Sequence, residues 1–390
     1  MIENFQAANK IVKKIEQAGF EAVFVGGAVR DYLLQKEQHD IDIATSALPL
    51  EIKGIFKKTV DVGIEHGTVL ILDEGEPIEV TSYRTESTYS DFRRPDEVQF
   101  VRSLEEDLKR RDFTMNAMAI RSNGELVDLF QGKQDIENRC IRAVGDPKER
   151  FMEDALRMLR AIRFVAQLGF SIEEQTLGAI QQCAPRIQHI AKERISAEMT
   201  KMWESAYVSK GIHYLLESGL SDYMAGNFTK FSDKFSSFRT QDANVGWAYL
   251  AYLNNEVHEL VTFYRLSKKT RLFMEKVVQA STKMYQNWGI IDTYSFDEDV
   301  IETAYHCLIW SGVKVDFKLE ALLNDKKMLP VQKTQDLAVT GRHLIEWSEG
   351  KGGPWLKKAL DEILVAVLQG QLENNSLAIK EWFKHEFNKE

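Results

Sequence analysis

A Gly-Gly pair that ends a short apolar run, with two aspartates shortly downstream, is the feature that most constrains this chain. Residues 21–25 are mainly apolar and lead directly into Gly26 and Gly27, a pattern that predicts a strand entering a tight turn. Because glycine has no side chain, the backbone N–H groups of such a turn can approach phosphate oxygens closely. We therefore expect Gly26 and Gly27 to bind the phosphates of a nucleotide.

The two aspartates belong to a second predicted strand. Residues 41–44 alternate as a strand does, so Asp40 and Asp42 are expected to project from one face. Two carboxylates one strand step apart form an oxygen-rich site suited to Mg²⁺, and phosphates can supply the remaining ligands. A Gly-Gly pair alone is usually only a turn, and an Asp-x-Asp alone is usually solvated surface. Their order and spacing together indicate a catalytic site for nucleotidyl transfer.

Glu79 is a candidate for a third catalytic carboxylate. It lies between Ile78 and Val80 in a predicted strand and would share a face with Thr81. A strand residue that simply faces solvent is an equally good interpretation, and the sequence leaves both open.

Composition narrows the class of protein. A chain of 390 residues exceeds one ordinary core, so two to four structural units are expected. With 44% hydrophobic and 28% charged residues the chain has the composition of a soluble protein, and no apolar run approaches the roughly 18 residues of a membrane span. The N-terminus is too polar for a signal peptide, and the three cysteines are scattered without Cys-x-x-Cys spacing. These features favour a cytoplasmic protein without a membrane partner or structural zinc.

The net charge of −9 is unusual for a protein that binds nucleic acid. Binding depends on the local field, however, and basic residues are concentrated in one segment against only four acidic ones. That segment contains Arg139, Arg142, Lys148, Arg150, Arg157, Arg160 and Arg163. Modest non-specific affinity for nucleic acid is therefore expected.

The spacing of apolar residues predicts an α+β fold. A helix over 3–18 and strands over 21–130, including 98–101 and a terminal hairpin at 117–129, form a head with a small sheet. From about 148 onward the pattern predicts helices and no convincing strand. These helices cover 149–168, 171–183, 193–203, 207–219 and 356–370.

The segment 110–117 reads Arg-Arg-Asp-Phe-Thr-Met-Asn-Ala and forms a second candidate site. An arginine beside a phosphate site donates bidentate hydrogen bonds that a lysine cannot. We assign Arg111 to the triphosphate of a nucleotide, and Asp112 and Asn116 either to its sugar or to ordering the site.

The segment 153–163 carries the strongest signal for base specificity. On a single helix, Asp154 and Arg157 would lie side by side on adjacent turns. A carboxylate that accepts from an exocyclic NH₂ and a guanidinium that donates to a ring nitrogen or carbonyl can recognise the Watson–Crick edge of C or A. The alternative is a plain i,i+3 salt bridge. Three arginines at i,i+3 spacing, Arg157, Arg160 and Arg163, would repel one another unless anions such as phosphates lie nearby.

Segments 26–45, 110–117 and 153–163 resemble the motifs of the DNA polymerase β superfamily of nucleotidyltransferases. Specifically, they resemble bacterial class II tRNA nucleotidyltransferases (CCA-adding enzymes), in the compact form that lacks a His-Asp phosphohydrolase domain. The resemblance implies that Arg30, Arg160 and Arg163 also contact nucleotide. It implies a structural role for the segment 193–199, and a role in adding the terminal A for the polar loop 86–96.

The resemblance also implies an architecture and a reaction. The architecture is a polymerase β-like nucleotidyltransferase head (1–147), a helical neck (148–205), a helical body (206–300) and a helical, tRNA-binding tail (301–390). The reaction transfers C, C and A from CTP and ATP to the 3′ end of tRNA, with Mg²⁺ as cofactor and pyrophosphate as product. The alternatives are a poly(A) polymerase, a CC-only or A-only enzyme, and a tRNA-binding protein that has lost catalysis. The sequence leaves open whether the protein forms a homodimer.

Overall fold

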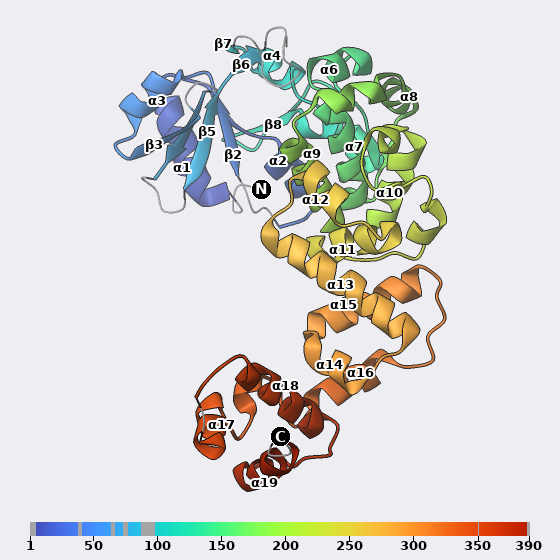
Figure 1. Ribbon diagram of the computed structural model, residues 1–390. Coiled ribbons are helices and arrows are strands. Elements are labelled where there is room, and N and C mark those ends of the chain that lie inside the picture. The colour runs from blue at the N-terminus through green and yellow to red at the C-terminus, as the bar shows by residue number, and fades with distance from the viewer. Residues whose placement is uncertain are drawn as a thin grey trace. The chain divides into compact units, whose positions relative to one another are not determined.

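The computed structural model describes residues 5–37, 41–63, 67–72, 77–86, 98–349 and 351–387. The chain divides into two compact units. The first contains Met1–Ala243 and Phe263–Arg265, and the second contains Asn244–Thr262 and Leu266–Glu390 (Figure 1). The finer boundaries expected at 147/148, 205/206 and 300/301 remain predictions.

A seven-stranded sheet forms the N-terminal part of the first unit and confirms the predicted α+β head. Its strands, in spatial order, are β3 (Thr59–Gly63), β4 (Thr68–Ile71), β5 (Ile78–Ser82), β2 (Asp42–Thr45), β1 (Ala22–Val25), β8 (Met118–Arg121) and β9 (Leu126–Asp128). Strands β2 and β5 are parallel, whereas the other neighbours are antiparallel. The predicted terminal hairpin is β8–β9.

The two faces of the sheet are covered by different helices. On one face Phe24 of β1 stacks on Phe5, directly before α1 (Gln6–Gln17), with ring centroids 4.6 Å apart. On the opposite face Val25 belongs to a buried cluster that includes Leu108 of α4 (Leu104–Lys109). Asp42 is the register partner of Val25 and therefore lies on the α4 face.

The predicted strand at 98–101 forms but does not join this sheet. Strand β7 (Val98–Phe100) pairs with β6 (Arg84–Glu86) in a separate antiparallel ribbon. The segment that we expect to act in adding A, 86–96, lies outside the described residues from position 87 onward.

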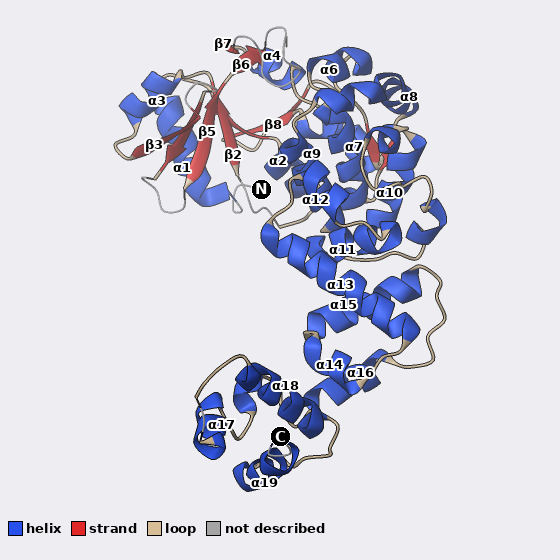
Figure 2. Cartoon of the chain, viewed as in Figure 1, coloured by secondary structure: helices blue, strands red, loops and turns tan. Residues whose placement is uncertain are grey.

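The rest of the first unit is mainly helical (Figure 2), with two departures from the sequence-based expectation. Its elements are α2 (Gly27–Leu33), α3 (Pro49–Ile55), η3 (Thr114–Asn116), α5 (Gly132–Glu137), α6 (Pro147–Glu153), α7 (Leu156–Leu168), α8 (Glu174–Cys183), η4 (Ala184–His189), α9 (Lys192–Trp203), α10 (Val208–Glu217), η5 (Leu220–Tyr223) and η6 (Ser232–Phe235).

First, the expectation of no strand after 148 is wrong. Strand β11 (Ser171–Ile172) pairs in parallel with β10 (Cys140–Ile141). It follows Gly169, which ends α7 at φ +71°. Two residues are too few to produce a period in the sequence, so the pairing is visible only in the fold.

Second, the single helix expected over 149–168 is broken. Helix α6 ends at Glu153, Asp154 has extended backbone angles (φ −138°, ψ 105°), and α7 begins at Leu156. The carboxylate of Asp154 accepts a hydrogen bond from the backbone N–H of Leu156 at 3.0 Å. Aspartate often satisfies the free N–H groups of a helix start in this way, which explains the break.

The second unit is helical in the part that the structure describes. Its elements are α13 (Lys268–Gln286), α14 (Ile290–Ser295), α15 (Glu298–Trp310), α16 (Leu319–Lys327), η7 (Thr334–Asp336), α17 (Gly341–Ser348), α18 (Trp355–Leu368) and α19 (Ser376–Phe387), and it also takes in most of α11 (Ala243–Asn254) and α12 (His258–Tyr264). The predicted apolar stripe of 356–370 is confirmed, since Ile363 and Val367 are buried against Ile379 and Phe383 of α19. No helix among the described residues is long and apolar enough to span a membrane.

Candidate active site

Gly26 is the point at which two of the predicted sites meet. It lies between β1 and α2 with φ +71°, a conformation that favours glycine. A Cβ atom at this position would lie 3.3 Å from Nη1 of Arg111 and 3.6 Å from Oδ2 of Asp42. The glycine turn, the strand aspartate and the arginine of the segment 110–117 therefore converge.

The predicted carboxylates lie on neighbouring strands. Asp42 on β2 and Glu79 on β5 are register partners in a parallel pair, so their side chains leave the sheet on the same face, and both residues are exposed. Asp40 lies outside the described residues. In the described part of the chain, no group of three or more His, Cys, Asp or Glu residues is arranged to hold a metal ion.

The guanidinium of Arg111 is only partly paired. Its Nη2 donates to Oδ2 of Asp107 at 3.0 Å, and its side chain is 17% exposed. Its Nε is buried and makes no hydrogen bond to any described residue. Nη1 of Arg111 lies beside the Gly26 turn, where it can donate to an anion.

Asp112 and Asn116 are buried and bonded to protein groups. Asp112 accepts from the Asn116 amide at 3.2 Å and from Arg160 Nε at 2.8 Å, and the Asn116 oxygen accepts from Arg30 Nη1 at 2.9 Å. Burial would raise the pKa of Asp112, but the Arg160 charge and the Asn116 hydrogen bond outweigh it and lower the pKa to about 2. Of the two roles that the sequence left open for Asp112 and Asn116, binding the sugar or ordering the site, these contacts favour ordering the site.

The arginines of α7 have counter-ions within the protein. Arg160 pairs with Asp112, Arg163 Nε donates to the buried Glu198 of α9 at 2.5 Å, and Arg157 Nη1 pairs with Glu153 at 2.7 Å. The anions that the three arginines require are therefore carboxylates of the protein: Asp112 and Glu198 come from distant segments, and Glu153 lies four residues before Arg157. Burial lowers the pKa of Arg163.

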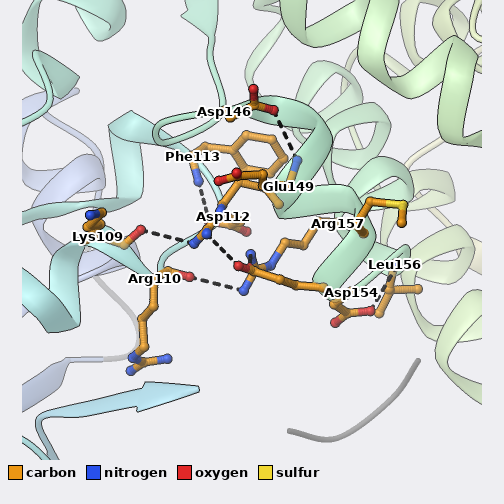
Figure 3. Close-up of polar contacts among 12 residues, drawn as sticks. Lys109, Arg110, Asp112, Phe113, Asp146, Glu149, Asp154, Leu156 and Arg157 are labelled. Carbon is orange, nitrogen blue, oxygen red and sulfur yellow. Dashed lines mark hydrogen bonds and ion pairs between the residues drawn. The ribbon is translucent and has the colours of Figure 1, made fainter. Parts of the chain in front are cut away.

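Asp154 and Arg157 do not share a helix. Both oxygens of Asp154 accept from Arg194 of α9, at 3.3 and 2.6 Å. Arg157 Nη2 donates to the backbone carbonyl of Arg110 at 3.0 Å, a contact that Figure 3 shows. The helix break thus leaves each residue with partners from other segments.

Sequence reasoning did not find three contacts that hold the site. Asp107, which lay in none of the candidate segments, contacts Arg111; Arg194, in the segment 193–199 expected to be structural, contacts Asp154; and Glu153, the first residue of the segment 153–163, contacts Arg157. Asp107 and Glu153 each precede their arginine by four residues, and that i,i+4 spacing was a usable signal. Arg194 carried no such signal, since forty positions separate it from Asp154.

A mixed sheet on which a glycine turn, a strand aspartate and an arginine meet is typical of nucleotidyltransferases of the poly(A) polymerase head type. The family profile of the poly A polymerase head domain matches residues 22–142. The profile of the probable RNA- and SrmB-binding site of polymerase A matches 169–229, and that of a putative tRNA nucleotidyltransferase domain 2 matches 238–383.

Comparison with individual proteins narrows the class. A CCA-adding enzyme of Bacillus cereus is 41% identical over 399 residues, covering 98% of this chain and 99% of its own. One from Streptococcus gordonii is 43% identical, with 97% of each chain covered. The crystal structure of the Bacillus stearothermophilus CCA-adding enzyme in complex with CTP superposes with a TM-score of 0.89 at 36% identity, covering 100% and 98% of the two chains. This chain belongs to the CCA-adding enzyme family of tRNA nucleotidyltransferases, a family that uses a divalent metal.

Proposed function

We propose that this protein adds C, C and A to the 3′ end of tRNA, using CTP and ATP and releasing pyrophosphate. The convergence of Arg111 and Asp42 on the Gly26 turn carries the proposal, since it combines phosphate binding and metal binding at one point. The family supports tRNA as the acceptor. Its three cysteines are scattered and form no disulfide, whereas secreted proteins often contain disulfides, and this favours the cytoplasm as its location.

We assign the metal site to Asp40 and Asp42, with Glu79 as the third catalytic carboxylate. Asp42 and Glu79 fit Mg²⁺ because both are exposed oxygen donors that leave paired strands on the same face. Bound Mg²⁺ would neutralise triphosphate charge and favour the ionised form of the attacking hydroxyl. Because β2 and β5 are hydrogen-bonded neighbours, the distance between the backbones that carry the two carboxylates is fixed before a metal binds.

Triphosphate binding is assigned to the backbone of Gly26 and Gly27 and to Arg111. The absence of a Cβ at Gly26 keeps the approach to the turn open, and Nη1 of Arg111, which lies beside the turn, is assigned the hydrogen bond to phosphate oxygens. Arg30, for which the resemblance implies a contact with nucleotide, is buried and bonded to Asp31 and Asn116, and we assign it to ordering the turn.

Base recognition is assigned to Asp154 and Arg157. Arg157 is buried, and its contact with the carbonyl of Arg110 holds it at the segment that carries Arg111. Arg160 is 34% exposed and can contribute a contact to nucleotide, whereas Arg163 is held internally by Glu198 and Gln167. Fixed donors and acceptors select a base because a mismatched edge leaves buried polar groups unpaired.

The deciding experiment offers purified protein a tRNA transcript that lacks its terminal CCA. CTP alone should yield a product two nucleotides longer, CTP with ATP a product three longer, and ATP alone no extension. Long A tails would identify a poly(A) polymerase. A product that ends after two C residues even with ATP would identify a CC-only enzyme, and extension only of a tRNA that already ends in CC would identify an A-only enzyme. Binding of tRNA without pyrophosphate release would leave only the non-catalytic alternative. Light scattering of the same sample reports whether a homodimer forms.

A further inference from the structure

The carboxylate of Asp107 is a charged group inside the head. It lies on α4, its side chain is 1% exposed, and it contacts two consecutive arginines. Oδ1 accepts from Arg110 Nη2 at 2.8 Å and Nε at 3.0 Å, and Oδ2 accepts from Arg111 Nη2 at 3.0 Å. An isolated buried carboxylate would be strongly unfavourable, so these partners account for its presence.

The charge state of Asp107 follows from the same contacts. Burial raises the pKa of the carboxyl, but the charges of Arg111 and Arg110 and their hydrogen bonds outweigh burial, so the pKa lies below its usual value. Asp107 is therefore ionised at neutral pH, and both arginines experience a fixed negative charge.

The geometry divides the donors of Arg111 between two directions. Nη2 is taken by Asp107, whereas Nη1 lies 3.3 Å from the position of a Cβ on Gly26, and Nε has no partner among the described residues. A planar guanidinium with one nitrogen fixed can no longer turn freely about its stem. The contact thus holds Nη1 beside the Gly26 turn, where Asp42 also lies.

Asp107 also contacts the ribbon that neighbours the site. The backbone N–H of Arg84, at the start of β6, lies 3.4 Å from Oδ1 of Asp107. Leu104 and Leu108 of the same helix pack in the cluster that contains Val25, the register partner of Asp42. Helix α4 is therefore packed against the strand pair beneath the site. Because Asp107 belongs to this helix, its contact with Arg111 holds the guanidinium in a fixed position relative to that strand pair.

We propose that Asp107 is a positioning residue for nucleotide binding: its carboxylate orients Arg111 so that Nη1 meets the triphosphate. The inference rests on the proposed function and extends it to a residue that does not itself touch nucleotide. Preorganised donors bind without an ordering cost, so releasing Arg111 weakens nucleotide binding more than it slows the chemical step.

The test is a double-mutant cycle on the full-length protein with Asp107→Asn and Arg111→Ala. Asp107→Asn should raise the KM for both CTP and ATP about tenfold and change kcat less than about threefold, because binding is affected more than chemistry. In the Arg111→Ala background the same substitution should raise KM less than about twofold, because the residue acts through Arg111. Calorimetric binding of CTP without tRNA should show the same pattern.

Glu173→Gln is the matched control for stability. Glu173 is a largely buried carboxylate that pairs with an arginine, Arg142, at 3.2 Å and accepts from the backbone N–H of Thr176 at 2.8 Å. It should lower the melting temperature comparably while leaving the KM for nucleotides within about twofold. If Asp107→Asn does not fold, Asp107→Glu keeps the charge and displaces the carboxylate, and a raised KM in that variant supports the proposal equally.

Two results would overturn the inference. One is an equal rise in KM whether or not Arg111 is present, which would make Asp107 an independent determinant. The other is a fall in melting temperature with unchanged KM in both Asp107 variants. A wild-type protein that transfers no nucleotide at all would instead refute the proposed function, so the two failures are distinguishable.

Discussion

Arg157 donates to the backbone carbonyl of Arg110 at 3.0 Å, and so joins the helix assigned to base recognition to the segment that carries Arg111. Asp112, two residues beyond Arg110, accepts from Arg160 one turn along the same helix. The groups assigned to base and triphosphate are therefore held by one set of contacts. Such coupling keeps the distance between base and phosphate recognition fixed.

Replacing Asp42 by Asn should abolish addition of both C and A and leave tRNA binding largely intact. The metal assigned to this carboxylate serves chemistry that is common to every step, and Asn removes the charge with little change of shape. Single-turnover assays with CTP and with ATP measure the loss, and gel-shift measures tRNA binding. Asp61→Asn, at an exposed carboxylate on β3 that pairs with Lys53, is the control and should retain activity. Near-normal turnover by the Asp42 variant would refute the metal assignment.

Gly26→Ala should impair nucleotide binding beyond its effect on stability. The positive φ costs alanine about 1–2 kcal/mol, and the new Cβ would crowd Arg111 and Asp42. Gly19→Ala is a close control, because Gly19 has φ +87° and a Cβ at that position would have no atom within 4 Å. Both variants should lose stability in urea titrations, but only Gly26→Ala should raise the KM for CTP. Equal kinetics in the two variants would contradict the close approach at Gly26.

Asp154→Ala and Arg157→Ala should each slow addition of C and A and allow U or G to be incorporated. Loss of one buried hydrogen-bonding partner typically costs about 1–3 kcal/mol of discrimination. Competition between the four nucleotides on one tRNA transcript measures the selectivity. Arg121→Ala, at an arginine that pairs with Glu21, should leave selectivity unchanged. If both site variants keep the wild-type preference, their contacts with Arg194 and Glu153 are purely structural.

The ionised Asp112 should stabilise the fold over a defined pH range. Its pKa falls from 3.8 to about 2 on folding, so its contribution is complete above about pH 4 and is lost as the pH falls toward 2. The shift corresponds to a contribution on the order of 2 kcal/mol. Urea unfolding at about pH 6 and about pH 3 measures it, and the difference in stability between wild type and Asp112→Asn should shrink at the lower pH. A difference independent of pH would contradict this assignment.

The sequence by itself determined the turns and strands of the head and the helical faces, because both depend on residues close together in the chain. The Gly26 turn, the strand that begins at Asp42, and the apolar stripe of α18 are local patterns with a known period, and each was predicted correctly. The polymerase β-like head with a helical remainder followed from the same patterns and the family resemblance.

Only the tertiary structure decided how these groups are balanced and held. It places Glu198 against Arg163 and Arg194 against Asp154, so carboxylates and arginines from distant segments neutralise one another. It also breaks the helix at Asp154, where a side-chain cap outweighs the apolar period on either side. Charge pairing between distant segments depends on distances in space, and spacing along the chain does not specify those distances.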